Sequence, residues 1–374
     1  MERRALNIAV LTSSRADYGI WLPLLQRFKL DAMHHVELIA FGTHLSPKHG
    51  HTIDAILNDG FEVQHRLDTL PDGDSPADIA SAMGKTMQVF AQFWNAHAKQ
   101  FDVVLCLGDR YEMFAAVAAS APFGVRVAHV HGGETTLGAI DNAFRHSITH
   151  FAQLHFVSAP AYAERVQSLT EKSEGIYTVG ALSLDNLRNM ELLTPEELTS
   201  QFHVNVDKQT ILCTFHPETI AHERNADYGN ELIAALLELA HHHVIITLPN
   251  ADTSGDTLRR MFVDAFADNE RVQLVENLGT HGYMSVMKHC GFLLGNTSSG
   301  ILEAASLGKY VIDLGERQRG RAHGSNVVHV AIERAAIVNA VREIGQLGDW
   351  KGTNMYDIGG AAEGIVLAIE NELC

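Results

Sequence analysis

Short apolar runs alternate with longer helix-forming segments along almost the whole chain, and this alternation limits the possible folds more than any other feature. The runs predict strands at residues 7–11, 36–40, 103–107, 125–130, 154–158 and 176–179, and again at 211–215, 244–248, 272–275, 291–294 and 310–314. Continuously apolar strands separated by helices are typical of parallel sheets, which are covered on both faces. The sequence therefore predicts the α/β class, built from βα units.

The predicted strands fall into two series, with a polar break near residues 181–200. A chain of 374 residues is long enough for two domains that each bury their own core. We expect one Rossmann-like domain over residues 1–180 and a second, nucleotide-binding one over residues 181–360, with their sheets facing a central cleft. Ligands of such sheets bind beyond the carboxyl ends of the strands. Functional residues are therefore expected at strand-to-helix turns.

The net charge of the chain limits the kinds of partner that it can bind. The formal net charge of −17 opposes broad binding to nucleic acid or to an anionic membrane. The first residues, MERRALNIAVLTSSR, hold only a short apolar run, which is neither a secretory signal nor a spanning helix. A cytoplasmic protein without nucleic-acid or membrane partners is expected, and any anionic ligand must be held by a local cluster.

The segment GNTSSGILE follows one of the apolar runs. Ser298, Ser299 and Gly300 are predicted to form the turn and the first helical residues, where free N–H groups and small side chains let a phosphate approach. The alternative is a plain Ser cap of the helix. Glu303 lies one turn further, where its carboxylate either accepts hydrogen bonds from sugar hydroxyls or is solvated.

Arginines follow two other predicted strands. Arg15 in SSRADYG can clamp a diphosphate with its fork of donors, or it can form a surface ion pair with Asp17. In GERQRGR, Arg317, Arg319 and Arg321 stand within five residues of an otherwise acidic chain. That concentration favours phosphate binding over a random charged loop.

Two further strand ends carry acids and bases. In LGDRYE, Asp109 and Arg110 come directly after an apolar strand, so Asp109 either caps the next helix or faces the ligand. The segment HVHGGETTLGAIDNAFRH gathers the side chains His131, Glu134, Asp141, Arg145 and His146. It has neither HExxH spacing nor a thiol, so acid–base work is favoured over metal binding.

The second series of strands adds two more candidate segments. His216 in FHPET precedes a proline, and Asn250 and Asp252 in LPNADTSG follow the next strand; a structural role or turn chemistry is the alternative for each. The run His241-His242-His243 has no acidic or cysteine partner at ligand spacing, so a polar loop is favoured there over a metal site.

Eight segments, in this order along the chain, resemble the hydrolysing UDP-N-acetylglucosamine 2-epimerases of bacterial sialic acid pathways: SSRADYG, LGDRYE, HVHGGET, IDNAFRHSITH, FHPET, PNADTSG, GNTSSGILE and GERQRGR. The resemblance implies a GT-B fold, with the nucleotide sugar between two Rossmann-like domains and a carboxyl-terminal helix over residues 361–374 that packs back on the first domain. It implies no cofactor, neither nicotinamide nor a catalytic metal. It also implies a homodimer or homotetramer.

The family's reaction eliminates UDP across C1 and C2 of the sugar and then adds water, which yields N-acetylmannosamine and UDP. The residues to which the resemblance assigns catalysis and contact with the leaving diphosphate are Asp109, Glu134, Asp141 and His216. The residues expected to bind the substrate are Arg15, Arg110, His131, Arg145, Asn250, Asp252, Ser298, Ser299, Gly300, Glu303 and Arg321. Several relatives carry Glu at the position of His131, so either Glu134, which we prefer, or His131 itself must take over that acid's role.

Four other functions share these segments. The closest rival acts on UDP-N,N′-diacetylbacillosamine in a legionaminic-type pathway, and a non-hydrolysing epimerase would leave its product attached to UDP. A GT-B glycosyltransferase would need an acceptor. A nucleotide-sugar sensor would bind without turnover.

Overall fold

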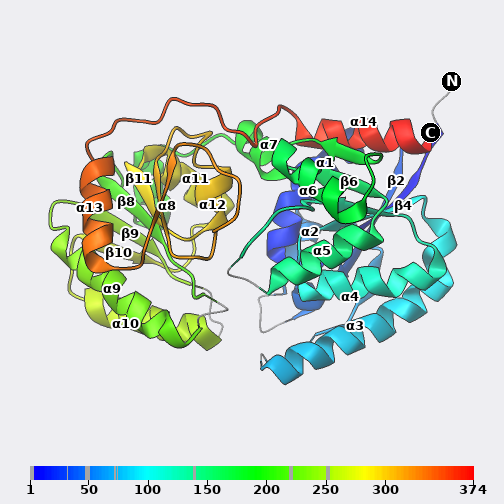
Figure 1. Ribbon diagram of the computed structural model, residues 1–374, viewed down its shortest axis with the longest axis horizontal. Helices are drawn as coiled ribbons and strands as arrows, with labels where there is room; N and C mark the ends of the chain where they lie inside the picture. The colour runs from blue at the N-terminus through cyan, green and yellow to red at the C-terminus, as the bar shows by residue number, and fades with distance from the viewer. Residues whose placement is uncertain are drawn as a thin grey trace. The chain divides into compact units, whose positions relative to one another are not determined.

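The computed structural model describes residues 4–31, 33–46, 51–70, 73, 75–137, 140–218, 222–249 and 253–374. The chain divides into two compact units. The first comprises Met1–Glu134, Asp141–Asn186 and Ile358–Cys374, and the second comprises Thr135–Ile140 and Leu187–Asp357. Each unit is a parallel sheet flanked by helices (Figure 1). The predicted α/β class with two parallel sheets is confirmed.

The first unit contains a seven-stranded sheet in the order β3-β2-β1-β4-β5-β6-β7. Its strands are β1 (Asn7–Thr12), β2 (His35–Phe41), β3 (His65–Leu67), β4 (Val103–Leu107), β5 (Val127–Val130), β6 (Leu154–Val157) and β7 (Ile176–Thr178). Its helices are α1 (Arg15–Asp31), α2 (Ile53–Asn58), α3 (Pro76–His97), α4 (Tyr111–Ser120), α5 (Asp141–Phe151), α6 (Pro160–Thr170) and α14 (Ala361–Leu373). The unit boundary falls within α7 (Leu182–Asn189).

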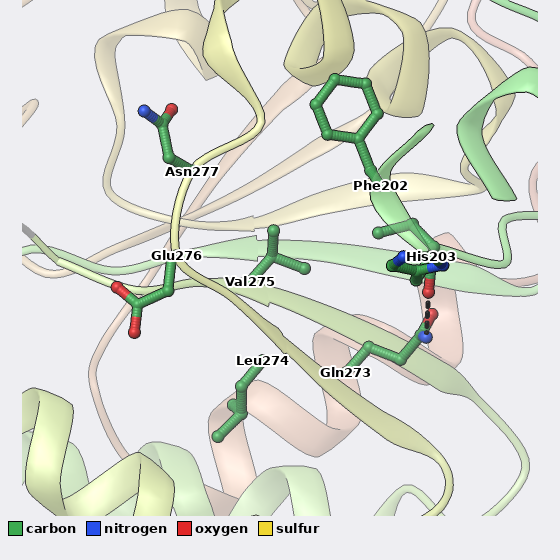
Figure 2. Close-up of a pocket in the computed structure, with 8 residues that line it drawn as sticks. Phe202, His203, Gln273, Leu274, Val275, Glu276 and Asn277 are labelled. Atoms are coloured by element: carbon green, nitrogen blue, oxygen red, sulfur yellow. Dashed lines mark hydrogen bonds between the residues drawn. The ribbon is translucent and has the colours of Figure 1, made fainter. Parts of the chain in front are cut away.

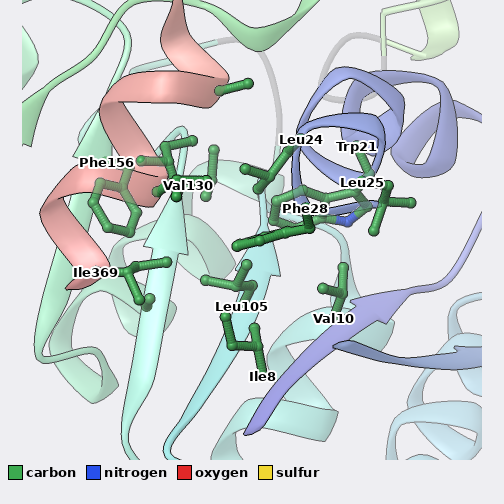
Figure 3. Packing of buried hydrophobic residues seen from close by; sticks show 14 of the residues in the cluster. Ile8, Val10, Trp21, Leu24, Leu25, Phe28, Leu105, Val130, Phe156 and Ile369 are labelled. Atoms are coloured by element: carbon green, nitrogen blue, oxygen red, sulfur yellow. The ribbon is translucent and has the colours of Figure 1, made fainter. Parts of the chain in front are cut away.

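Helices cover both faces of the first sheet. Alternate residues of the same strand therefore pack in two different hydrophobic clusters. Ile8 and Val10 of β1 pack in one cluster with α1 and α14, whereas Ala9 and Leu11 pack in another with α3 and α4. Figure 3 shows the first cluster, in which α1 and α14 supply Trp21, Leu24, Leu25, Phe28 and Ile369. The last helix of the chain thus belongs to the core of the first unit.

The second unit contains a six-stranded sheet in the order β10-β9-β8-β11-β12-β13. Its strands are β8 (Thr210–Thr214), β9 (His243–Thr247), β10 (Val272–Val275), β11 (Phe292–Gly295), β12 (Val311–Leu314) and β13 (Val327–Val330). Its helices are α8 (Pro195–Phe202), α9 (Asn225–Glu238), α10 (Thr253–Phe266), α11 (Gly279–His289), α12 (Ser298–Leu302) and α13 (Arg334–Ile344).

Each sheet reverses its strand order once. The reversal lies between β1 and β4 in the first unit and between β8 and β11 in the second. Ligands of open parallel sheets bind outside the carboxyl ends of the strands at this reversal. A ligand site is therefore expected at the loops that follow these four strands.

Two strands were not expected from the sequence. β3 and β13 each lie at an edge of their sheet, and neither is a continuous apolar run: β3 reads His-Arg-Leu with no buried residue, and only the first residue of β13 is buried. An edge strand needs fewer apolar side chains because it has a neighbour on one side only. Among the helices in the described ranges, none is long and apolar enough to cross a membrane.

Candidate functional site

The loop between β1 and α1 is held by its own side chains. The Asp17 carboxylate accepts hydrogen bonds from the Ser13 N–H at 2.9 Å and the Ser13 hydroxyl at 2.6 Å, and the Ser14 hydroxyl accepts from the Asp17 N–H at 3.3 Å. Ser14 therefore caps the helix and Asp17 ties its first turn back to Ser13, and the alternative ion pair between Arg15 and Asp17 is not formed. Arg15 is exposed and has no ion pair among the described residues.

Three predicted residues meet where β4 ends and α5 begins. The Arg145 guanidinium is almost fully buried and donates a hydrogen bond to the Asp109 carboxylate. Burial and the nearby charge of Asp109 raise the pKa of Asp141, the first residue of α5. Two neighbouring acids in different environments are the arrangement that separates a proton donor from a proton acceptor.

Arg110 takes a different partner from its neighbour Asp109. Its guanidinium forms an ion pair at 2.7 Å with Glu112, whose side chain is buried. The Arg110 charge also acts on Asp17 and Asp141, so it lies among the polar groups at this end of the sheet. It is thus a shared counter-charge for several acids.

Glu134 sits in a buried hydrogen-bond network after β5. One carboxylate oxygen is 2.8 Å from Nδ1 of His131 and accepts from the Ser158 hydroxyl at 2.8 Å. His131 has a φ of 63°, a conformation that costs a non-glycine residue about 1–3 kcal/mol and persists only where the surroundings enforce it. Its Nε2 is buried without a partner in the described ranges. Gly133 makes the turn possible, since a Cβ there would lie 2.6 Å from the Tyr162 carbonyl oxygen.

Asn296 joins three strand-end loops of the second unit. It is fully buried, and its amide exchanges two hydrogen bonds of 2.8 Å with the backbone N–H and carbonyl of His216. Its own carbonyl accepts from Arg317 Nη1 and from Gln318 Nε2, each at 2.9 Å. The loops after β8, β11 and β12 thereby meet at one residue that the sequence analysis did not single out: its side chain bonds the loop after β8, and its backbone carbonyl bonds the loop after β12.

The helix expected at the serine-rich turn begins at Ser298 and ends at Leu302. Its cap is Thr297, not a serine: the Thr297 hydroxyl accepts from the Ser299 N–H at 3.4 Å, and the Thr297 carbonyl accepts from the Gly300 N–H at 3.2 Å. The N–H groups of Ser299 and Gly300, which were expected to be free for an anion, are therefore already hydrogen-bonded within the turn. The Ser298 and Ser299 hydroxyls are half-buried and form no hydrogen bond within the described part of the chain.

Gly300 and Glu303 both face inward from this turn. A Cβ on Gly300 would lie 2.9 Å from Val311 of β12, so this glycine lets the helix pack closely on the sheet. That packing accounts for Gly300 without a ligand. Glu303 follows the helix and is 4 % exposed, which excludes the alternative of a solvated acid.

The three arginines of the loop after β12 differ in their surroundings. Arg317 bonds to Asn296, and Arg321 is half-buried. Arg319 is exposed and pairs with Glu316 at 2.7 Å, so it behaves as an ordinary surface ion pair. The sequence did not distinguish Arg319 from the other two.

His216 is held in the neutral form. Burial, aided by the Arg317 charge, lowers the pKa of its imidazole to about 3. The buried Glu218 fixes the next part of the same loop, because its carboxylate accepts from the Glu316 N–H at 2.8 Å. Glu218 and Asn296 stand inside segments that the sequence analysis quoted, but their local patterns resemble those of any turn residue.

Asn250 and Asp252 lie outside the described residues. A groove of ≈ 380 Å³ in the second unit runs along the free edge of β10, between Phe202–Val204 and Gln273–Asn277 (Figure 2). Its one carboxylate, Glu276, is paired with Arg259, and no predicted site residue lines it. Within the described ranges no group of three or more His, Cys, Asp or Glu side chains is arranged to hold a metal ion.

Comparisons with known proteins agree with one another. Residues 26–370 match the family model described as UDP-N-acetylglucosamine 2-epimerase. The chain is 32% identical to the polysialic acid biosynthesis protein P7 of Escherichia coli, over 90% of this chain and 85% of that protein. It is 30% identical to a hydrolysing UDP-N,N′-diacetylbacillosamine 2-epimerase of Legionella pneumophila, over 96% of this chain and 93% of that protein.

Solved structures support the fold. The UDP-GlcNAc 2-epimerase of Neisseria meningitidis, solved with UDP-GlcNAc bound, superposes with a TM-score of 0.81 at 17% identity, covering 98% of this chain and all of that one. Together with the two parallel sheets described above, this places the chain among proteins of the GT-B type.

Proposed function

Because the chain belongs to the UDP-N-acetylglucosamine 2-epimerase family, we propose that it is a hydrolysing enzyme that converts UDP-N-acetylglucosamine and water into N-acetylmannosamine and UDP. The observation that carries this proposal is the pair of acid–base clusters at the strand ends of the first unit, Asp109 with Arg145 and Asp141, and Glu134 with His131. The name of the Legionella pneumophila relative supports the hydrolytic outcome, and the name of the Escherichia coli relative supports a role in polysialic acid biosynthesis.

The first step of the proposed reaction is an elimination. A carboxylate removes the C2 proton while the bond between C1 and the diphosphate oxygen breaks, which leaves a 2-acetamidoglucal and UDP. Glu134, with its carboxylate oriented by His131 and Ser158, is suited to the proton at C2. Asp141, whose pKa is raised by burial and by Asp109, is suited to donate a proton.

The second step adds water across the double bond. The water oxygen attaches to C1, and a proton returns to C2 on the face opposite to the one it left, which gives the manno configuration. The base that removed the first proton cannot deliver one to the opposite face, so a second group must protonate C2. Asp141, whose pKa is raised, is suited to this donation, and its carboxylate can then accept the proton that the attacking water loses.

The second unit is suited to the leaving group. Neutral His216, the Ser298 and Ser299 hydroxyls and the Arg317 guanidinium offer hydrogen-bond donors, and Arg321 adds a charge. Donors fixed before the reaction stabilise the charge that develops on a departing diphosphate without having to reorganise. Arg15, exposed at the start of α1 in the first unit, has no ion pair among the described residues and offers a further cation for an anionic substrate.

Product analysis in heavy water tests the proposal. Purified protein incubated with UDP-N-acetylglucosamine in D₂O should release free N-acetylmannosamine with one deuterium at C2, seen by NMR. A product still attached to UDP would instead identify a non-hydrolysing epimerase. Release of UDP only after an acceptor sugar is added would identify a glycosyltransferase, and binding without any turnover would identify a sensor.

The diacetamido sugar is the second candidate substrate, because a relative with 30% identity over nearly its whole length carries that activity in its name. The same assay with UDP-N,N′-diacetylbacillosamine distinguishes the two. Turnover of this substrate, with none of UDP-N-acetylglucosamine, would replace our first choice while keeping the reaction.

A further inference from the structure

Two histidines of the second unit face each other outside the predicted site. His329 lies on the edge strand β13, and His323 lies on the connection between β12 and β13. Their Nε2 atoms are 3.0 Å apart, and both residues are exposed to solvent. Neither residue has a role in the proposed function.

The other nitrogen of each ring is already engaged. His323 Nδ1 is 3.0 Å from the Gly324 carbonyl oxygen, which can only accept, so the proton of that ring is on Nδ1. His329 Nδ1 is 2.8 Å from the carboxylate of Asp313, which is 1 % exposed and stands directly opposite on β12. With both Nδ1 atoms donating, each neutral imidazole presents a lone pair at Nε2, and the two lone pairs face the same gap.

The separation of the two rings fits an ion held between the two nitrogens. Each centroid lies about 1.15 Å from its Nε2, so a straight N–H···N hydrogen bond in the plane of both rings would separate the centroids by about 5.3 Å. The centroids are 4.6 Å apart, with the rings at 83° to each other. Two nitrogens 3.0 Å apart, each bonded to one zinc ion at about 2.0–2.1 Å, would place the centroids about 4.7 Å apart.

We infer that His323 and His329 form a binding site for a divalent transition-metal ion of the zinc type, coordinated through both Nε2 atoms. Asp313 and the Gly324 carbonyl orient the two ligands from behind, which is how metal-binding imidazoles are usually held. The described residues supply no third protein ligand. Water molecules therefore fill the remaining coordination positions, and the site is open to exchange.

Zinc is the ion of choice because neutral imidazole is among its preferred ligands, whereas magnesium and calcium prefer oxygen. The position has a structural consequence. Residues 315–326 connect β12 to β13 and include Arg317 and Gln318, which bond to Asn296. An ion shared by His323 and His329 clamps the end of this connection to the sheet.

Zinc titration of the full chain tests the inference. Zinc chloride is added in a buffer that does not bind metal, in competition with a chromogenic chelator. The unaltered protein should bind an ion that is lost in both His323→Gln and His329→Gln. Asp313→Asn should weaken the same site about 10- to 100-fold, the usual effect of removing a group that orients a metal ligand.

A matched control addresses the other histidines of the chain. His241→Gln removes an exposed histidine from the run of three at residues 241–243 and should leave the titration unchanged. Circular dichroism verifies that each variant is folded. If the unaltered chain binds no zinc, or if both single variants bind it as the unaltered chain does, the inference is wrong and the pair shares only a proton.

Discussion

The two units organise the ends of their strands in different ways. In the first unit, the loops hold ionisable side chains in pairs: Asp109 with Arg145, and Glu134 with His131. In the second, one neutral residue, Asn296, joins the loops: its side-chain amide bonds the backbone of His216, and its backbone carbonyl accepts from Arg317. The same sheet architecture thus presents groups that can exchange protons in one case and rigid donors in the other.

The difference indicates a division of work. Proton transfer needs groups whose protonation can change, and their pKa values depend on burial and nearby charge, as for Asp141. Binding an anion needs donors that keep both their protons and their positions. A neutral His216 and a buried Asn296 meet that need. Four experiments test this division of work.

The largest effect is expected from Asp109→Asn. Asp109 pairs with Arg145 and raises the pKa of the proton donor Asp141, so its loss should lower kcat by about 10²- to 10⁴-fold, while the dissociation constant for UDP should not change. Steady-state kinetics and calorimetric UDP titration measure the two quantities. Asp264→Asn, an exposed change on α10, is the control. Equal losses of turnover and UDP affinity in Asp109→Asn would contradict the division of work.

Acid should destabilise the first unit more than the second. Burial lowers the pKa of His44 to about 4, of His129 to about 3 and of His155 to about 4, so all three are neutral when folded. The unfolded chain takes up these protons below about pH 6.5, so stability falls as the pH drops from there towards 4, by about 2 kcal/mol per histidine at pH 5. The raised pKa of Asp141 acts in the opposite direction, but for one group. In the second unit, His216 also has a lowered pKa, so it too reduces stability as the pH falls, but it is one group against three.

Hydrogen exchange read by mass spectrometry at pH 7 and pH 5 measures this difference. After correction for intrinsic rates, protection should fall more in β4, β5 and β6 than in β8 and β11. His155→Gln should reduce the pH dependence of the first unit, whatever it does to stability at pH 7. Equal losses of protection in both sheets would show that the buried histidines do not set acid sensitivity.

Asn296→Ala should have an intermediate effect. It leaves the N–H and carbonyl of His216 without partners, which should cost about 1–3 kcal/mol of unfolding free energy, and it should weaken UDP binding. Asn326→Ala is a matched control, because Asn326 is also buried but lies at the start of β13, where it bonds to the Lys309 carbonyl. Chemical denaturation and UDP titration should show similar stability losses, with weakened UDP binding only in Asn296→Ala. Equal UDP affinities in the two variants would remove Asn296 from the anion-binding group.

The smallest effect is expected from Ser158→Ala. This change removes a hydrogen bond to the Glu134 carboxylate, worth about 0.5–1.5 kcal/mol, so kcat should fall up to about tenfold with UDP affinity unchanged. Ser147→Ala, which removes an exposed hydroxyl bonded to its own helix, is the control. An unchanged kcat in Ser158→Ala would mean that the Ser158 hydroxyl is not needed to orient Glu134.

Much of the fold could be predicted from the sequence, because buried parallel strands are continuous apolar runs. β8, β11 and their neighbours were found in this way, and so were the polar segments that follow them. The edge strands β3 and β13 could not be predicted in this way, because they need few apolar side chains. The helix at Ser298 was expected, but its Thr297 cap was not, because serine and threonine are both common caps.

The sequence also could not predict which residues of the candidate site pair with each other. Arg145 was singled out 36 positions from Asp109, but nothing local says that the two meet. Arg15 and Asp17, only two positions apart, invited a pairing that the loop does not form. Asn296 is 80 positions from His216 and 21 from Arg317, and no pattern of such length marks a hydrogen bond.

The sequence by itself determined where strands end and which polar residues follow them, since both depend on patterns a few residues long. Only the tertiary structure decided which of these residues pair, which are buried and which of the arginines stay on the surface. The reason is that parallel pairing brings the carboxyl ends of strands together across long stretches of chain, and the environment created there sets each hydrogen bond and each pKa.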